Sequence, residues 1–346
     1  MNTINDAPIV RDPLLDAAWD QTLTQYQDAT VFHTTAWIRV LLDTYGYRTQ
    51  SVTFEEGTTD EWTILLSEVN SSITGRRLVS LPFSDFCPPL TRDGTRLTID
   101  RIRAAVGSWL TRGYRYVELR DAEKECLGEP PTFLVHDLDL TKGDECLWSG
   151  IASSTRRNVR KANREGLAVR FDLGSTAMEA FYRLHCQTRK KHGVPPQAWR
   201  FFDGIQRHLI APGNGFIASA VLRDTVLAAN VYLTVGQSAV YKFGASDQRY
   251  LGYRPNDLLM WESIRRLTSA GCHSLSFGRT SMHQAGLIRF KRAFGASERP
   301  MTYTRYTRRE TSRVPGDEPG VSRIVLSRMP VGVLRFLGRL LYRHVG

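Results

Sequence analysis

Hydrophobic positions along the chain recur with two periods, and together they predict the same order of elements twice. In the first half, apolar residues at helical spacing are followed by alternating runs typical of strands. The elements expected there are a helix at 34–45, strands at 48–54, 62–69 and 77–81, a helix carrying Ile99, Ile102, Val106 and Trp109, and a strand at 116–119. Those expected in the second half are helices at 176–191 and 197–209, strands at 216–222, 226–235 and 238–243, a helix that opens at Pro255, and a strand at 273–277. The repeat predicts two domains that share one order of helices and strands.

The stretch 241–295 contains most of the candidate chemistry. It is predicted to form a strand, a loop, a helix, a strand and a last helix, for which Ser281 is a candidate cap. The first free N–H groups of a helix that follows such a loop favour an anion. Arg249 and Arg254 would add positive charge to that loop. An ordinary crossover loop with solvated arginines is the open alternative.

The length and the net charge of the chain limit the classes of protein to which it can belong. A chain of 346 residues is long enough for two medium domains. The formal charge of +11 favours a polyanionic partner such as a nucleotide phosphate, RNA or an anionic membrane. The N-terminal stretch does not have the pattern of a secretory signal, so we expect a cytoplasmic protein. Five cysteines far apart, with no C-x-x-C pair, argue against a metal site.

Four short segments of the second half resemble FemAB-type aminoacyltransferases and their acetyltransferase-like relatives from exopolysaccharide and cell-envelope gene clusters. These segments are GAS at 244–246, PNDLLMWESI at 255–264, a strand that ends in FG at 277–278, and GLIRFKRAFG at 286–295. The resemblance covers roughly residues 30 to 310, and FK-x-x-FG is its most specific part. It implies an α/β (α+β) fold of two GNAT-like domains in tandem, with mixed, mainly antiparallel sheets flanked by helices. The expected division is an acceptor-side domain at 1–150, a donor-side domain at 151–310, and a linker with a basic amphipathic helix at 311–346.

The resemblance also implies a reaction in which an amine attacks an activated acyl carbon directly. Such a reaction needs two positioned substrates and a donor for the developing oxyanion. Lys291 of the FK motif is the expected cationic donor, and Phe290 packs beside it. Tyr241 and Lys242, at a predicted strand end, are further candidates, although Tyr241 suits a core aromatic equally well.

The loop before the helix at 255 bears on the identity of the acyl donor. Enzymes of this superfamily that use CoA hold its pyrophosphate in a glycine-containing loop at this place. Arg249 and Gly252 agree with that pattern, whereas Arg254 replaces its second small residue. We therefore expect no permanently bound cofactor, and acyl-CoA as the co-substrate. Aminoacyl-tRNA is the alternative donor, although the coiled-coil arm common in tRNA-dependent relatives has no counterpart here.

Acceptor residues are expected in the first domain. The loop PFSDF at 82–86 corresponds to one that lines the acceptor site of relatives, and Asp85 could orient the acceptor amine or take its proton. A turn residue before prolines is the equally simple alternative. Arg39 is carried over as a contact to acceptor phosphates; a surface arginine is its alternative.

Two further segments of the sequence are rich in basic residues. The stretch STRRNVRKANREG at 154–166 places Arg156 and Arg160 among five basic residues, which could hold phosphates of a nucleotide-linked acceptor or of RNA. Its alternative is a solvated linking helix. Between 330 and 346, leucines and arginines fall on opposite faces of a predicted helix. That helix suits either an anionic inner membrane, bringing the enzyme to a lipid-linked acceptor, or packing on the protein surface.

The pattern as a whole predicts an N-acyltransferase that uses a thioester donor and an amine of a cell-envelope or exopolysaccharide precursor. One alternative is a tRNA-dependent aminoacyltransferase of the kind that builds peptidoglycan interpeptide bridges. Another is a non-catalytic binding module of an envelope-assembly complex.

Overall fold

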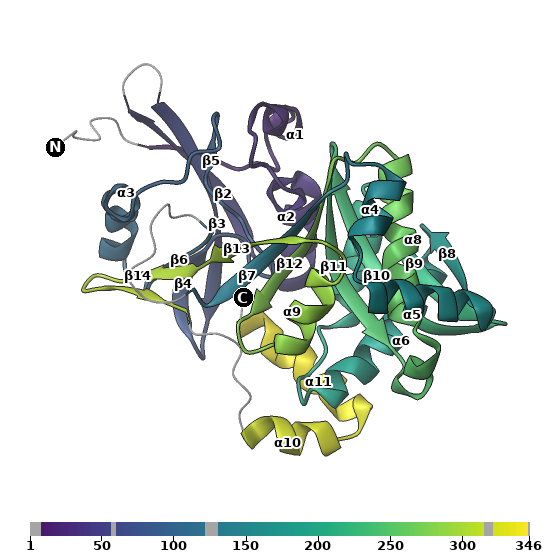
Figure 1. Cartoon of the computed structure of the whole chain (residues 1–346). Coiled ribbons are helices and arrows are strands. Elements are labelled where there is room, and N and C mark those ends of the chain that lie inside the picture. The colour runs from purple at the N-terminus through teal and green to yellow at the C-terminus, as the bar shows by residue number, and fades with distance from the viewer. Residues whose placement is uncertain (1–7, 57–59, 122–130, 315–320, 345–346) are drawn as a thin grey trace. The chain divides into compact units, whose positions relative to one another are not determined.

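A computed structural model describes residues 8–56, 60–121, 131–314 and 321–344 (Figure 1). The chain divides into two compact units. Unit 1 comprises Met1–Phe133, Pro300–Gly316 and Tyr342–Gly346, and unit 2 comprises Leu134–Arg299 and Asp317–Leu341. The expectation of two mixed, mainly antiparallel sheets flanked by helices is confirmed.

Unit 1 is built on a sheet with the strand order β1-β2-β3-β4-β6-β14-β15, and β5 pairs with β3. Its strands are β1 Ile9–Arg11, β2 Arg48–Glu56, β3 Asp60–Ser71, β4 Gly75–Val79, β5 Leu90–Thr91, β6 Val117–Arg120, β14 Tyr303–Tyr306 and β15 Thr311–Arg313. Its helices are α1 Trp19–Thr22, α2 Thr35–Tyr45 and α3 Ile99–Thr111. The Thr34 side chain caps α2 by accepting from the Trp37 N–H; of the two threonines that the sequence offers as a cap, Thr34 and Thr35, the structure uses the first.

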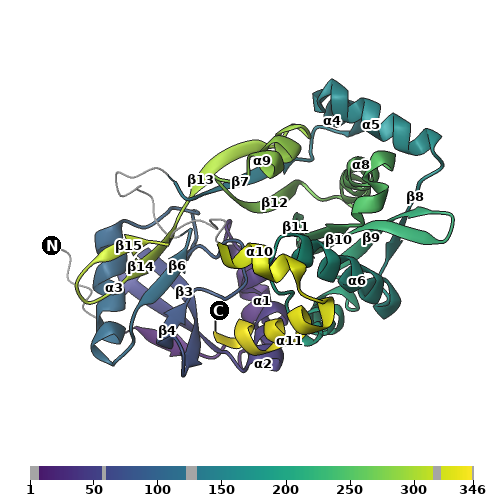
Figure 2. The same ribbon diagram turned by 90° about the horizontal axis from the view of Figure 1, so that it is seen from below.

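Unit 2 is built on a second sheet with the order β13-β7-β12-β11-β10-β9-β8. Its strands are β7 Phe133–Asp139, β8 Ala168–Asp172, β9 Gly215–Leu222, β10 Thr225–Val235, β11 Ser238–Ser246, β12 Ser274–Ser281 and β13 Ser297–Met301. Its helices are α4 Asp144–Gly150, α5 Ser153–Arg164, α6 Ser175–Lys191, α7 Trp199–Ile205, α8 Pro255–Ser269, α9 Ala285–Arg292, α10 Val321–Arg328 and α11 Val331–Leu341. Helices α6 and α8 lie on opposite faces of this sheet (Figure 2).

The two sheets repeat one topology. In unit 1, β2, β3 and β4 form an antiparallel meander, and β6 returns parallel to β4, with Leu78 opposite Val117. In unit 2, β9, β10 and β11 form the same meander, and β12 returns parallel to β11, with Val240 opposite Ser276. A helix connects the parallel pair in each case, α3 in unit 1 and α8 in unit 2. The internal repeat read from the hydrophobic pattern is therefore present in the fold.

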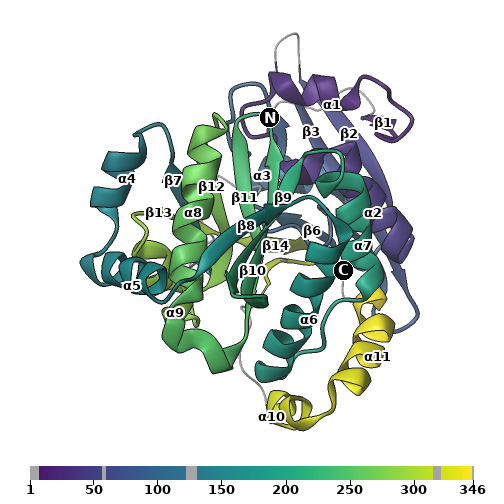
Figure 3. The ribbon, with the colours of Figure 1, turned by 90° about the vertical axis from the view of Figure 1, so that its right-hand side faces the viewer.

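Two local expectations need correction. Ser281 does not cap the last helix of the stretch, because it is the final residue of β12 and α9 begins after Gln284. The basic segment between the halves is not a detached linker. It forms α5, which buries Val159 and Ala162 in the core of unit 2 beside α8 (Figure 3).

Candidate functional site

Strands β11 and β12 of unit 2 are paired over only part of their length. Their parallel register covers Ser238–Val240 and Ser274–Ser276. Residues 241–246 of β11 and 277–281 of β12 lie beyond the paired part. β11 remains paired with β10 over residues 241–246, and β7 is the other neighbour of β12, so only the facing edges of β11 and β12 separate here. Two of the predicted residues, Tyr241 and Lys242, lie on this part of β11.

Tyr241 is the first residue of β11 beyond its register with β12. Its ring lies 5.5 Å from that of Tyr232 and 6.3 Å from that of Phe277 on β12. Its hydroxyl lies over Gly244, where an added Cβ atom would be 1.8 Å from the oxygen, so only glycine fits beneath it. Burial raises the pKa of the Tyr241 phenol, which keeps the group neutral at physiological pH. Lys242 points to the other side, with its ammonium 5.2 Å from the Phe243 ring.

The loop after β11 forms a 3₁₀ turn, Gln248–Tyr253, and leads into α8. The Asp247 carboxylate caps this turn by accepting from the Arg249 N–H at 3.0 Å, and it also accepts from the Arg249 guanidinium at 2.6 Å. Gly252 is exposed, and nothing lies within 4 Å of an added Cβ. Arg254 has a φ of 61°, a left-handed conformation that glycine adopts most readily. The turn therefore has the backbone that a small residue would favour at the position of Arg254.

Helix α5 packs beside the start of α8. Asp257, in the first turn of α8, has a raised pKa because burial opposes its charge, and the Asn158 side chain of α5 partly offsets this by a hydrogen bond. Arg160 is exposed, with its guanidinium 5.7 Å from the Trp148 ring, and Arg156 is half-buried. The predicted arginines therefore lie on a helix that adjoins the loop and the α8 N-terminus.

Lys291 is buried, with only 2% of its surface exposed. Its ammonium donates to the carbonyl oxygen of Gly278 at 2.9 Å and to that of Arg279 at 3.4 Å. Both carbonyls belong to the part of β12 beyond its register with β11, so the lysine ties α9 to that strand. Phe290 packs on Phe294 with ring centroids 5.2 Å apart. Tyr241 and Lys291 therefore contact adjacent residues of β12: the Tyr241 ring lies near the Phe277 ring, and the Lys291 ammonium donates to the Gly278 carbonyl oxygen.

A buried histidine in the adjacent strand β7 was missed by the sequence analysis. His136 Nε2 lies 2.8 Å from Glu298 Oε1, and Arg292 holds the same carboxylate through two hydrogen bonds of 2.7 and 2.6 Å. Burial and the charge of Lys291 lower the pKa of His136. The ring is therefore neutral, with Nε2–H donating to Glu298 and a lone pair on Nδ1. Among the described residues, that Nδ1 has no hydrogen-bond partner. The alternating run FLVHDLD is the signal that would have indicated a strand here.

The end of β12 holds two further polar groups without partners. The hydroxyls of Thr280 and Ser281 are buried, and neither meets a hydrogen-bond partner within the described parts of the chain. A buried polar group without a partner costs about 1–3 kcal/mol. A bound water or a polar substrate group at this strand end would recover that cost.

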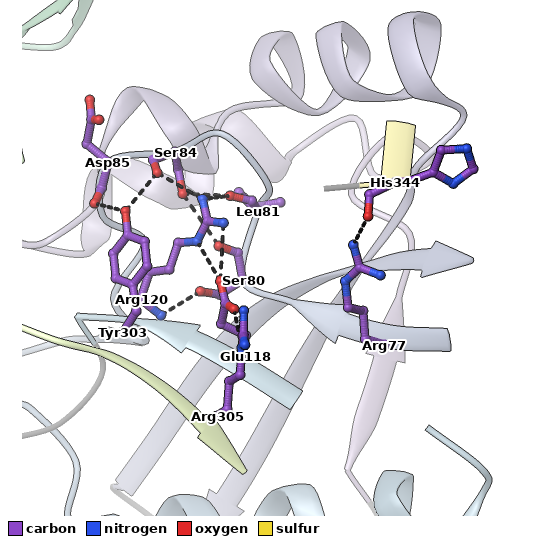
Figure 4. A network of polar contacts seen from close by, with 10 residues as sticks. All are labelled: Arg77, Ser80, Leu81, Ser84, Asp85, Glu118, Arg120, Tyr303, Arg305 and His344. Atoms are coloured by element: carbon purple, nitrogen blue, oxygen red, sulfur yellow. Dashed lines mark hydrogen bonds and ion pairs between the residues drawn. The ribbon is translucent and has the colours of Figure 1, made fainter. Parts of the chain in front are cut away.

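In unit 1, a buried polar network holds the PFSDF loop (Figure 4). Arg120 donates to the carbonyl oxygens of Leu81 at 3.2 Å and Ser84 at 2.9 Å, and its guanidinium also contacts Glu118. The Tyr303 hydroxyl donates to the carbonyl oxygen of Asp85 at 2.6 Å. The loop contains two non-glycine residues in left-handed conformations, Leu81 at a φ of 46° and Phe83 at 63°.

Figure 4 shows the Asp85 carboxylate pointing away from Arg120, while the Asp85 carbonyl oxygen is held by Tyr303. Unfavourable backbone conformations persist only where surrounding contacts enforce them, and they concentrate at functional sites. Arg39 is exposed on α2. Asp85 and Arg39 therefore belong to unit 1, and the other predicted residues belong to unit 2.

Comparison with known proteins agrees with this architecture. Residues 152–292 match the family model for the acetyltransferase (GNAT) domain. The chain is similar to the crystal structure of FemX, with a TM-score of 0.62, 12% identity, and coverage of 82% of this chain and 93% of FemX. The fold is therefore the FemAB-like tandem GNAT fold, and it supports acyl or aminoacyl transfer in general.

Two further solved structures have the same architecture. A tandem GNAT protein from the clavulanic acid biosynthesis pathway matches with a TM-score of 0.51 and 10% identity, covering 90% of this chain and 99% of that one. L-PGS from Bacillus licheniformis matches with a TM-score of 0.51 and 13% identity, covering 90% and 96%. No curated protein matches the sequence.

The described residues contain neither a candidate metal site nor a helix able to cross a membrane. They contain no group of three or more histidine, cysteine, aspartate or glutamate side chains placed to hold a metal ion. No helix in the described part of the chain is both long enough and apolar enough to cross a membrane.

Proposed function

We propose that the protein is an N-acyltransferase that moves an acyl group from a thioester such as acyl-CoA to an amine of a cell-envelope or exopolysaccharide precursor. The observation that carries this proposal is the divergence of β11 and β12 within the segment that matches the GNAT family model. The turn at 248–253 and the first N–H groups of α8 follow β11 directly, where they can meet donor phosphates. Arg249, Gly252 and Arg254 are the residues of this turn assigned to the donor.

In this mechanism the acceptor amine attacks the acyl carbon, a C–N bond forms, and the C–S bond to the thiolate leaving group breaks. Lys291 supplies the positive charge near the developing oxyanion, since its ammonium is fixed at the Gly278 and Arg279 carbonyls. The carboxylate of Asp85 takes the role of orienting the acceptor amine or accepting its proton. Arg39, Tyr241, Lys242 and Phe290 are assigned to substrate contacts.

A second candidate is aminoacyl transfer from charged tRNA. The specific observation in its favour is the basic helix α5, where Arg157, Arg160 and Arg164 are exposed beside the α8 N-terminus. A structure titled as a putative lysylphosphatidylglycerol synthetase domain also matches, with a TM-score of 0.51 and 14% identity. The name of that neighbour favours a lipid as the acceptor.

The experiment is a transfer assay with amine acceptors, run in parallel with acetyl-CoA and with aminoacyl-tRNA, each with and without RNase. The thioester proposal predicts turnover that RNase does not change. Turnover that RNase abolishes would establish the tRNA-dependent alternative instead. No turnover with either donor, together with an unchanged cellular phenotype for Lys291→Met, would favour a non-catalytic binding module.

A further inference from the structure

The two helices at residues 321–341 pack on unit 2 and yet leave a second apolar face open. Helices α10 and α11 both contact α6 (Figures 2 and 3). Leu334 is fully buried, and a Cβ on Gly338 would lie 1.9 Å from the Pro196 carbonyl oxygen. The guanidinium of Arg335 lies 5.5 Å from the Tyr182 ring. These contacts determine which side of α11 faces the protein.

The opposite side of α11 carries large apolar residues in contact with solvent. Phe336 is 60% exposed, and Val333 and Leu340, which share its helical face at three- and four-residue spacing, are 44% and 47% exposed. Ile324 and Val325 on α10 are also exposed. Six of the thirteen exposed large apolar side chains among the described residues lie between 324 and 341. We call this the α10–α11 face.

The charges around the α10–α11 face have one sign. The sequence from 321 to 346 contains five arginines and no aspartate or glutamate. Arg328 on α10 and Arg339 on α11 are exposed. Exposed apolar side chains flanked by arginines match an anionic lipid surface, in which the apolar groups enter the acyl boundary and the guanidinium groups meet lipid phosphates.

We propose that the α10–α11 face docks the protein on an anionic membrane, with Phe336 and Leu340 inserted at the lipid interface. Other occupants fit less well. Two copies of the face would bring like charges together. An RNA partner would leave exposed valine, isoleucine and leucine without the stacking that single-stranded nucleic acids provide to aromatic side chains. The proposal is independent of the acyl-transfer chemistry, which is assigned to residues outside α10 and α11.

The test is co-sedimentation of the full chain with phosphatidylcholine vesicles, with and without phosphatidylglycerol. We expect binding that requires phosphatidylglycerol and falls about tenfold or more in Phe336→Glu and Leu340→Glu. Arg328→Ala and Arg339→Ala should each weaken it about fivefold, as expected for about 1 kcal/mol per basic residue. Leu15→Glu is the matched control, because Leu15 is 85% exposed in unit 1 and its change adds the same charge elsewhere.

Three results would overturn the proposal. One is no sedimentation with either vesicle type. Another is sedimentation that Phe336→Glu and Leu340→Glu leave unchanged. The third is a vesicle-free dimer, detected by light scattering, that Leu340→Glu dissociates, since a second copy would then cover the face. Circular dichroism of each variant verifies folding, and none of these results depends on an acyl-transfer assay.

Discussion

The Lys291 ammonium of helix α9 donates a hydrogen bond of 2.9 Å to the carbonyl oxygen of Gly278, in the part of β12 beyond its register with β11. The lysine expected to serve catalysis therefore also has a structural contact. Its aliphatic stem crosses a buried region, and its charge lies at the strand end that Tyr241 also reaches.

Replacing Lys291 by methionine should lower both stability and transfer. The buried Gly278 carbonyl would lose its donor, which costs about 1–3 kcal/mol of unfolding free energy. Loss of an oxyanion donor should lower kcat by about 10²–10³. Urea unfolding and the transfer assay, run where the variant is fully folded, measure the two effects. Arg289→Met on the same helix is the control. If transfer by the folded Lys291→Met protein equals that of the wild type, the lysine is structural only.

Tyr303→Phe and Asp85→Asn together distinguish stabilisation of the PFSDF loop from a catalytic role of the Asp85 carboxylate. Because the Tyr303 hydroxyl contacts the main chain of Asp85 and not its carboxylate, Tyr303→Phe should destabilise unit 1 by about 1–3 kcal/mol. Asp85→Asn preserves those main-chain contacts and the size of the side chain, so it should lower the melting temperature less than Tyr303→Phe does, while transfer falls. Equal thermal shifts for the two variants would mean that the Asp85 side chain stabilises the loop.

Arg254 allows backbone and charge effects to be distinguished. Glycine tolerates a φ of 61° better than alanine, so Arg254→Gly should be more stable than Arg254→Ala by about 1 kcal/mol. Both variants remove the charge and should weaken donor binding to the same extent. Thermal unfolding and calorimetry with acetyl-CoA provide the two readings. Donor binding restored in Arg254→Gly alone would assign the effect to the backbone.

Two buried histidines predict loss of stability in mild acid. Burial lowers the pKa of His33 in unit 1 to about 4 and that of His185 in unit 2 to about 3. Below about pH 6.5 the unfolded chain binds protons that the folded chain does not, so stability falls as the pH decreases from 6.5 towards these values. At pH 5 each histidine should cost about 2 kcal/mol relative to pH 7.5. Urea midpoints across this range, with His185→Gln against the exposed His283→Gln, test the assignment; equal slopes for the two variants would refute it.

Local signals predicted much of the fold. The cap at Thr34, the proline that opens α8 and the alternation in β9 to β11 depend on neighbouring residues, and the structure has each of them. Strands β7 and β14 escaped prediction because each joins a sheet beside a strand distant in sequence: β7 lies next to β12, and β14 pairs with β6. The identity of such a distant partner leaves no local trace, even where the strand itself has a local pattern such as FLVHDLD in β7.

The candidate site was predictable only in part, because local motifs indicate single residues but not their contacts with residues distant in sequence. The FK motif pointed to Lys291 without showing that its ammonium would be buried against backbone carbonyls. His136 and Glu298 lie 162 positions apart in the sequence, so nothing near either residue indicated their contact. Likewise, the left-handed conformation of Arg254 follows from the turn into α8, in which its N–H donates to the Leu251 carbonyl oxygen.

Donor binding is the measurement that tests the central claim most directly. The purified full chain is titrated with acetyl-CoA and, separately, with aminoacyl-tRNA while its thermal unfolding is followed. A ligand selective for the folded state adds about 2.7 kcal/mol of apparent stability at a hundred times its Kd. We predict stabilisation by acetyl-CoA that Arg254→Ala reduces. Stabilisation by aminoacyl-tRNA alone, with none by the thioester, would contradict the assignment of a thioester donor.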